Sequence, residues 1–216
     1  KVTLTASAIS KGLISHLEIG DLSARRDWGH AEDFVNGMWL MLQCDEAEEY
    51  LLCTGQLHSV RELVQIAFAT AGIVLRWEGT GKDEVGINTT TNFVVVRVND
   101  VFYAPSDGKY FELTKVRPNA RVVGNNTKAL DKLGWSHTYN FEDIIQQMVL
   151  HDLSLSDHEI LQELGLESSV NSIITGDGKL QDLATHPAVS VMQMPPSFEP
   201  GQRLKKFLQE VQITYT

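Results

Sequence analysis

Apolar side chains recur every three or four positions in several stretches of this chain, and that spacing predicts amphipathic helices. Capping residues mark where some of them begin: Ser59 and Glu62 form a capping box, and Asn140 is a typical N-cap residue. Gly134 follows another periodic stretch, as expected for a residue that ends a helix. The predicted helices cover residues 1–13, 31–43, 60–71, 126–132 and 141–152.

Short runs rich in valine, leucine and isoleucine lie between these helices and predict strands. The run at residues 49–54 is almost continuously apolar, which is typical of a parallel strand that is buried on both faces. Such a strand needs parallel neighbours, and we expect them to come from outside residues 1–216. Strands that alternate with helices predict an α/β fold. The predicted strands cover residues 17–20, 49–54, 73–77, 92–98 and 121–123.

The last part of the chain, residues 157–216, is too apolar to be disordered. It contains a predicted helix around His158–Leu164 and another over Gly201–Val211. The second helix carries an apolar stripe that needs a covering surface. We expect this extension to pack on the main body or on another chain.

Composition and charge exclude some classes of function. Hydrophobic residues make up 43% and charged residues 21%, as in ordinary globular proteins. The formal net charge of -10 argues against a nucleic-acid surface, which needs a basic patch. No apolar run is long enough for a membrane helix, so we expect no membrane insertion. Cys44 and Cys53 show neither metal-ligand spacing nor a disulfide framework, which predicts reduced thiols in the cytoplasm or another reducing compartment.

Two arginines, a carboxylate, an indole and an imidazole directly precede the predicted helix at 31–43, in the sequence RRDWGH (residues 25–30). An arginine fork donates two parallel hydrogen bonds to a phosphate, and a helix N-terminus adds N–H groups and partial positive charge. The stretch therefore predicts either a phosphate or diphosphate site, or ion pairs between the arginines and nearby carboxylates. For Arg26, those carboxylates are Asp27 and Asp33. We expect His30 to make a local hydrogen bond at the helix entry rather than bind a ligand.

A second candidate phosphate site, the sequence GTGK at residues 79–82, fails on its spacing. A P-loop needs a glycine where Arg76 stands, and a dinucleotide fingerprint needs one at Glu84. We interpret this sequence as a turn after a strand.

The arginine stretch and the sequence after it, RRDWGHAEDFVNGMWLMLQ, resemble the corresponding part of GDP-mannose 4,6-dehydratases. These are extended members of the short-chain dehydrogenase/reductase superfamily, within the NAD-dependent epimerase/dehydratase family. The resemblance continues through EEYLLCTGQLHSVRELVQIAF, AGIVLRWEGTGKDEVG and TKALDKLGW, and covers about residues 1–153 with poor matching from Ile87 to Val116. RDWGHA together with TGQLHSVRE is specific to this family rather than to the superfamily.

The resemblance implies the C-terminal half of such an enzyme. That half holds the last parallel strand and helix of a Rossmann-type domain plus the small substrate-binding domain. We expect it at residues 1–156, followed by an unmatched C-terminal extension at 157–216. The glycine-rich cofactor loop and the Tyr-x-x-x-Lys pair of the family belong to the half that precedes Lys1.

The resemblance also implies an activity. Enzymes of this family bind GDP-mannose and a tightly held NADP, oxidise the sugar, eliminate water and return the hydride. The product is the 4-keto-6-deoxy sugar that leads to GDP-fucose. No tyrosine here is followed four positions later by a lysine, so no catalytic residue is assigned. The expected partners are a GDP-sugar, a missing N-terminal half or another protein chain, and further copies in an oligomer.

The resemblance implies that basic residues of this chain form part of the substrate site. Lys1 matches the family lysine that contacts the GDP part, and Arg26 matches the arginine of RDWGH that holds the diphosphate. For Lys1 the alternative is a frayed terminal residue without a binding role.

The third family arginine lies in a Tyr-x-Arg-Pro-x-Glu-Val motif, from which this sequence departs. Alignment by the Arg-Pro pair retains the arginine as Arg117, although Ala120 replaces the glutamate. Alignment by Tyr110 instead replaces the arginine by Glu112, whose charge would repel a diphosphate. We prefer the first alignment, because it keeps Arg117.

Two functions therefore stay open. The chain is either the substrate-binding portion of a dehydratase whose other half supplies NADP and the catalytic residues, or a non-catalytic subunit of a larger assembly. The altered Arg-Pro region and the unmatched extension favour the second, and the intact RDWGH and TGQLHSVRE stretches favour the first.

Overall fold

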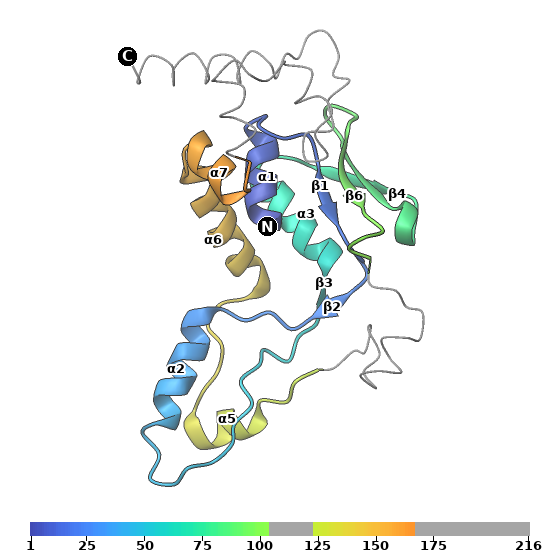
Figure 1. The fold of residues 1–216 in the computed structure, drawn as a ribbon. Helices are drawn as coiled ribbons and strands as arrows, with labels where there is room; N and C mark the ends of the chain where they lie inside the picture. Colours follow the sequence, from blue (N-terminus) through green and yellow to red (C-terminus); the bar gives the residue numbers. More distant parts are fainter. Residues whose placement is uncertain (104–122, 167–216) are drawn as a thin grey trace, which may run out of the picture.

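The computed structural model describes residues 1–103 and 123–166. In this part of the chain, a mixed four-stranded sheet has the strand order β1-β6-β5-β4 (Figure 1). Strand β1 pairs with β6 in parallel, while the β6–β5 and β5–β4 pairs are antiparallel. The strands are β1 Leu17–Ile19, β4 Leu75–Glu78, β5 Val85–Asn88 and β6 Val94–Val98, and a two-stranded ribbon joins β2 Arg25–Arg26 to β3 His58–Ser59.

Some helices lie near the sheet, and others lie farther from it (Figure 1). Helices α1, α3 and α6 pack against one another, and α7 packs on α1. Helix α2 instead contacts α5, away from the sheet. The helices are α1 Val2–Ser10, α2 Ala31–Met41, α3 Val60–Thr70, α5 Thr127–Leu133, α6 Phe141–Ser154 and α7 Asp157–Glu163, with a 3-10 turn η1 at Gly81–Asp83.

The main core forms between the sheet and helices α1, α3 and α6. Phe68 and Val64 of α3 are fully buried against Val96 of β6 and Val149 of α6. The apolar faces of α3 and α6 lie largely where the helical spacing predicts them, because each helix covers the core with one side only. Met148 of α6 is the exception, since its predicted inward position is 49% exposed.

Helix α1 differs from its predicted pattern, since it is buried on more than one side. Thr3, Thr5 and Ser7 are buried together with Ala6 and Ala8. Helices α3 and α6 cover one side, while Ile160 and Leu161 of α7 cover another. The small side chains of α1 let neighbouring helices approach it closely from two directions. Because some of these side chains are polar, the hydrophobic pattern did not predict all of the buried sides of α1.

The predicted strand at residues 49–54 is wrong for the described structure, because this segment forms no regular element. A strand exists only with a partner, and no described strand pairs with it. The strand predicted at 73–77 lies at Leu75–Glu78 and forms an antiparallel hairpin with β5, which sequence reasoning missed. Residues 79–82 form the expected turn, with Lys82 paired to Asp100 at 2.9 Å.

The helix ends follow the capping prediction closely. Ser59 and Glu62 form the capping box of α3, and Asn140 caps α6 in a second box with Asp143. Gly134 ends α5 with a φ of 64°, a left-handed conformation that favours glycine. Asn126 is at the N-cap position of α5, but its side chain donates to the Cys53 carbonyl at 3.0 Å instead of capping the helix.

Helices α2 and α5 form a small unit of their own, which we call the α2–α5 lobe and define as residues 31–57 and 123–139. Trp135, 1% exposed, fills its centre, and its Nε1 donates to the Asp33 carbonyl at 2.7 Å. Gly37 lets α2 approach closely, because an added Cβ would lie 2.9 Å from Trp135 Nε1 and 2.6 Å from Leu52 Cδ1.

The predicted helix around His158–Leu164 is confirmed as α7. Its Ile160 and Leu161 are buried against Ala8 and Ile14, so the first residues of the proposed extension pack on the main body. The predicted elements at 121–123 and 201–211 lie wholly or mainly outside the described residues. Within 1–103 and 123–166, no helix has the length and apolar character that crossing a membrane requires.

Candidate nucleotide-sugar site

The parallel strands β1 and β6 end beside each other, and two of the predicted binding residues can be placed relative to that end of the sheet. Ile19 is in register with Val98, and the Asn99 amide donates to the Ile19 carbonyl at 2.9 Å where both strands end. Arg26 follows β1 along the chain, and Lys1 at the start of α1 lies against Phe102, just after β6. Ligands of α/β proteins commonly bind at the carboxyl ends of parallel strands.

Lys1 is held at this end by a cation–π contact. Its Nζ lies 4.4 Å from the centroid of the Phe102 ring. Gly20, just after β1, has no room for a side chain beside the Phe102 backbone, which shows how closely these segments approach. Sequence reasoning missed Phe102, because nothing in the local pattern indicates that residue 102 lies next to residue 1.

Arg25 has a structural role. Its side chain is half-buried, and Nη2 donates to the Leu57 carbonyl at 2.9 Å. The bond fastens the chain before α2 to the chain before α3, where Arg25 also pairs with Ser59 in the β2–β3 ribbon.

Arg26 is exposed, and its guanidinium makes a single hydrogen bond among the described residues. Its Nη1 donates to the Arg25 carbonyl at 2.7 Å, and it forms no ion pair with any carboxylate of the described residues. Asp27 instead accepts from the Thr54 and Gly55 amides, at 3.1 and 2.9 Å. Asp33 accepts from the amides at positions 138 and 139. The alternative that Arg26 pairs with Asp27 or Asp33 is therefore not what the structure shows, and its guanidinium keeps donors for an anion.

His58 lies opposite Arg26 in the β2–β3 ribbon. The His58 ring stacks on the Phe141 ring, with centroids 3.9 Å apart and an angle of 8° between the ring planes. The centroid of the Trp28 ring lies 5.3 Å from that of Phe141. His58 Nδ1 is 3.3 Å from Glu62, whereas Nε2 is buried without a hydrogen-bond partner among the described residues. This aromatic group fixes the backbone beside Arg26. His58 belongs to the TGQLHSVRE stretch that resembles the family, but the sequence does not indicate that it lies opposite Arg26. Only the pairing of β2 with β3 shows this.

His30 behaves as predicted. It is the N-cap of α2, and its Nδ1 accepts from the Glu32 amide at 3.2 Å. Its ring also stacks on Tyr139, with centroids 4.0 Å apart. The Tyr139 hydroxyl donates to Glu32 at 2.9 Å, which raises the pKa of Tyr139 and keeps the hydroxyl protonated.

Helices α2, α3 and α6 begin close to this ribbon, as the His30–Tyr139 and His58–Phe141 stacks show. Three helix N-termini would attract an anion through their partial positive charge. Each first turn, however, already holds a carboxylate, and the helix ends are capped. The attraction for a diphosphate must therefore come from side chains such as Arg26. The first-turn carboxylates are Glu32, Asp33, Glu62, Glu142 and Asp143.

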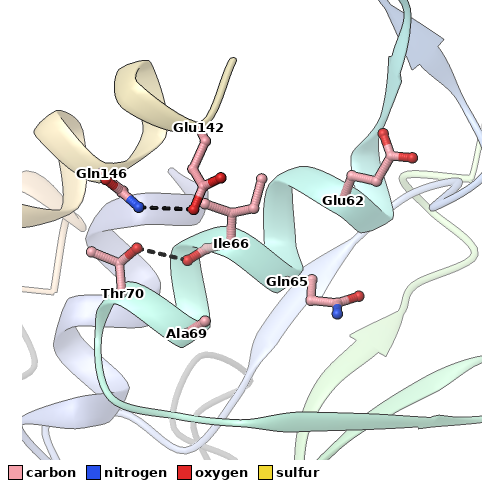
Figure 2. A pocket seen from close by; sticks show the side chains of 7 residues that line it. All are labelled: Glu62, Gln65, Ile66, Ala69, Thr70, Glu142 and Gln146. Atoms are coloured by element: carbon pink, nitrogen blue, oxygen red, sulfur yellow. Dashed lines mark hydrogen bonds between the residues drawn. The ribbon is translucent and has the colours of Figure 1, made fainter. Parts of the chain in front are cut away.

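A groove of about 490 Å³ runs between α3 and α6, and the residues that line it do not include Arg26 or Lys1 (Figure 2). Glu62 and Glu142 line it, and Glu142 accepts from Gln146 at 2.9 Å. Two carboxylates at a groove disfavour a bound diphosphate through like-charge repulsion. The groove is therefore a poor candidate for the nucleotide-sugar site.

The remaining predicted binding residue, Arg117, lies outside the described residues. Lys1 and Arg26 are on separate elements, and no hydrogen bond or ring contact joins them. Across the described ranges, no group of three or more His, Cys, Asp or Glu side chains could hold a metal ion.

Cys44 and Cys53 are both free thiols. Cys53 is 7% exposed, and its pKa is raised by burial and by the nearby Asp27 charge, although a hydrogen bond from the Gly55 backbone opposes this. Because thiolates rather than thiols react with alkylating agents, we expect iodoacetamide at pH 8 to modify Cys53 at least about tenfold more slowly than the half-buried Cys44.

Mass spectrometry of peptides, sampled over time, would measure both rates. In urea the two thiols should react alike, which serves as the control. Equal rates in the folded chain would contradict the burial of Cys53.

Comparison with known proteins identifies similar sequences over the same part of the chain. The GDP-mannose 4,6-dehydratase of Sinorhizobium fredii is 42% identical over 154 residues, which are 71% of this chain and 41% of that protein. The human GDP-mannose 4,6 dehydratase is 37% identical over 155 residues, or 72% of this chain and 39% of its own. The chain thus spans about two fifths of the length of these relatives.

A solved structure supports the fold. RMD from Pseudomonas aeruginosa, complexed with NADPH, has a TM-score of 0.52 at 19% identity, and the match covers 71% of this chain and 41% of that one. The fold is α/β and corresponds to a C-terminal portion of an extended short-chain dehydrogenase/reductase. The family profile of GDP-mannose 4,6 dehydratase matches residues 1–148, and the chain belongs to this family.

Proposed function

We propose that this chain is the nucleotide-sugar-binding portion of a GDP-mannose 4,6-dehydratase, with Arg26, Lys1 and Arg117 as binding residues. The observation that supports this best is Arg26 itself. It is exposed in the β2–β3 ribbon, which follows β1 along the chain, and the two neighbouring carboxylates are bonded to backbone amides instead. Arginine is well suited to a diphosphate, because its planar fork donates two parallel hydrogen bonds.

The cofactor of this proposed enzyme is NADP, and the residues described here do not fit it. Gly79 precedes and Gly81 begins a 3-10 turn whose Lys82 pairs with Asp100 and lies near the Tyr103 ring. No helix N-terminus follows this turn to receive a pyrophosphate. We therefore assign no chemical step to a cofactor held by these residues, and place cofactor binding and the Tyr–Lys pair in the other half of the family fold. We also propose a reducing compartment and self-association for the complete assembly.

The substitution Arg26→Ala tests the site. We expect it to weaken GDP-mannose binding by roughly 1.5–3 kcal/mol, the range for hydrogen bonds to charged groups. Isothermal titration calorimetry on the wild type and the variant would measure the difference. Arg76→Ala is the matched control, because Arg76 is also an exposed arginine but bonds to Glu78 of β4 and to Asn92 in the turn between β5 and β6.

Equal affinity of the wild type and Arg26→Ala would remove Arg26 from the site. An equal loss with Arg76→Ala would show a general effect of positive charge rather than a specific contact.

A second candidate function is a non-catalytic subunit of a larger assembly. The observation that favours it is the altered Arg-Pro region, where Ala120 stands in place of the family glutamate. A wild-type chain that does not bind GDP-mannose, even when its partner half is present, would support this second function.

A further inference from the structure

The groove between α3 and α6 is acidic at one end (Figure 2). Both helices begin at the β2–β3 ribbon, as the stacking of His58 on Phe141 shows, so their first turns lie close together. Glu62 and Glu142 line the groove from these first turns. No lysine or arginine within the described ranges forms an ion pair with either carboxylate. This end of the groove therefore favours a cationic partner.

Apolar side chains lie beyond the acidic end of the groove. Ile66 and Ala69 of α3 line it, and Ala69 is exposed. Leu150 of α6 follows Gln146, another lining residue, by four positions, so both lie on the same side of the helix. The Leu150 side chain is 60% exposed. Exposed apolar side chains that gather beside a groove are typical of a surface that another segment or molecule covers.

The last predicted helix of the chain, at Gly201–Val211, has the complementary pattern. Its sequence GQRLKKFLQEV contains three basic residues in the first half and one acidic residue near the end. Leucine, phenylalanine and valine recur at spacings of three and four positions and form one apolar side. The basic residues are Arg203, Lys205 and Lys206, and the apolar residues are Leu204, Phe207, Leu208 and Val211.

We propose that residues 201–211 dock as a helix in the groove between α3 and α6 of the same chain. Their basic first half lies at the two glutamates, and their apolar side covers the apolar part of the groove. The lengths agree, because a helix rises about 1.5 Å per residue, so residues 203–211 and residues 62–70 of α3 each span about 12 Å. An amphipathic helix in a groove is a common mode of recognition, and charges at the rim determine its direction.

The covalent connection favours the same chain over a second copy. The last described residue, Leu166, follows α7, and residues 167–200 join it to the predicted helix. An extended residue spans about 3.3 Å, so this connection is long enough to reach the groove. It also raises the effective concentration of the helix at its own groove above that of a separate chain. The inference does not rest on the proposed function, because neither Arg26 nor a GDP-sugar takes part in the docking.

Carbodiimide crosslinking of the full chain tests the position of the helix. The reagent joins a lysine amine directly to a carboxylate that it contacts, so we expect crosslinks from the two lysines of the helix to the two glutamates of the groove. Mass spectrometry of peptides would identify them, and a mixture of isotope-labelled and unlabelled chains separates crosslinks within one chain from those between chains. Glu48 is the internal control, because it pairs with Lys128 and Lys132 and should crosslink to them in every sample.

Amide hydrogen exchange at residues 203–211 measures whether the helix is docked. An isolated helix of this length is only marginally stable in water, so protection of its amides requires a covering surface. Exchange in the wild type should be at least about tenfold slower than in Phe207→Glu, which puts a charge on the apolar side. Gln209→Glu is the matched control, because it adds the same charge outside the apolar side and should keep both the protection and the crosslinks.

Gln146→Lys tests the groove itself. A lysine at this position pairs with Glu142 four positions before it and neutralises the acidic end, so exchange at residues 203–211 should become about threefold to fivefold faster. Gln147→Lys is the control, since Gln147 is an exposed glutamine of α6 that does not line the groove, and it should leave the exchange rate unchanged.

Three results would overturn the inference. Fast exchange in the wild type would show that the helix is not docked, and crosslinks to other carboxylates would place it on a different surface. Crosslinks found only between chains would assign the groove to the helix of a second copy. The crosslinks of the wild type decide the matter even where a substituted chain fails to fold.

Discussion

Trp135→Ala should destabilise the α2–α5 lobe by about 3–5 kcal/mol, the usual cost of truncating a buried aromatic side chain to alanine. Trp135 is 1% exposed, and it is the residue that α2 packs against at Gly37. The substitution also removes the donor to the Asp33 carbonyl. Because Trp135 is not part of the core formed by α1, α3 and α6, we expect the loss to be local.

Hydrogen exchange measured by mass spectrometry would locate this effect. Amides of α2 and α5 should exchange faster in Trp135→Ala, whereas those of α1 and α3 should keep their protection. Trp39→Ala is the control, since Trp39 is 58% exposed and its truncation should change stability by no more than about 0.5 kcal/mol. Equal acceleration along the whole chain would contradict a lobe that unfolds on its own.

Helix positions and ends could be predicted from the sequence because local interactions determine them. The Ser59–Glu62 box, the cap at Asn140 and the stop at Gly134 all involve residues within a few positions of each other. Asn126 shows the limit of this reasoning. Its side chain bonds to Cys53, 73 residues away, and the local pattern contains no sign of that partner.

Strands were harder to predict, because a strand depends on its neighbours. Strand β5 was missed, since Gly86 interrupts the run and the charged residues before it resemble a loop. Residues 49–54 have the expected apolar character, yet no described strand lies beside them. An apolar run therefore does not form a strand unless another strand pairs with it.

The candidate site was predictable in part. The arginine stretch indicated Arg26, but the sequence could not decide between an ion pair and a free guanidinium. That choice depends on Asp27 and Asp33, whose partners lie 27 to 106 residues away along the chain. Contacts such as Lys1 with Phe102 and His58 with Phe141 likewise join residues distant in sequence.

Asp33 is the residue whose role differs most from what its position in the chain indicates. It stands in the first turn of α2, where a carboxylate ordinarily serves its own helix. Here it is 5% exposed and accepts from the amides of Thr138 and Tyr139, at 3.0 and 3.2 Å. Its own carbonyl accepts from Trp135. One residue thereby ties α2 to the connection between α5 and α6.

Asp33→Ala should therefore cost about 2–4 kcal/mol, because two backbone N–H groups lose their acceptor. Asp33→Asn keeps one side-chain oxygen and turns an amide donor toward these N–H groups, so we expect it to recover only part of the loss. Urea unfolding followed by circular dichroism, with exchange at residues 138 and 139, would measure both variants. Asp131→Ala is the control, as an exposed aspartate on α5 whose loss should change stability by no more than about 0.5 kcal/mol. Full stability of Asp33→Ala would show that solvent replaces the carboxylate, and the attachment of α2 would then rest on Trp135 and on the contacts of Tyr139 with His30 and Glu32.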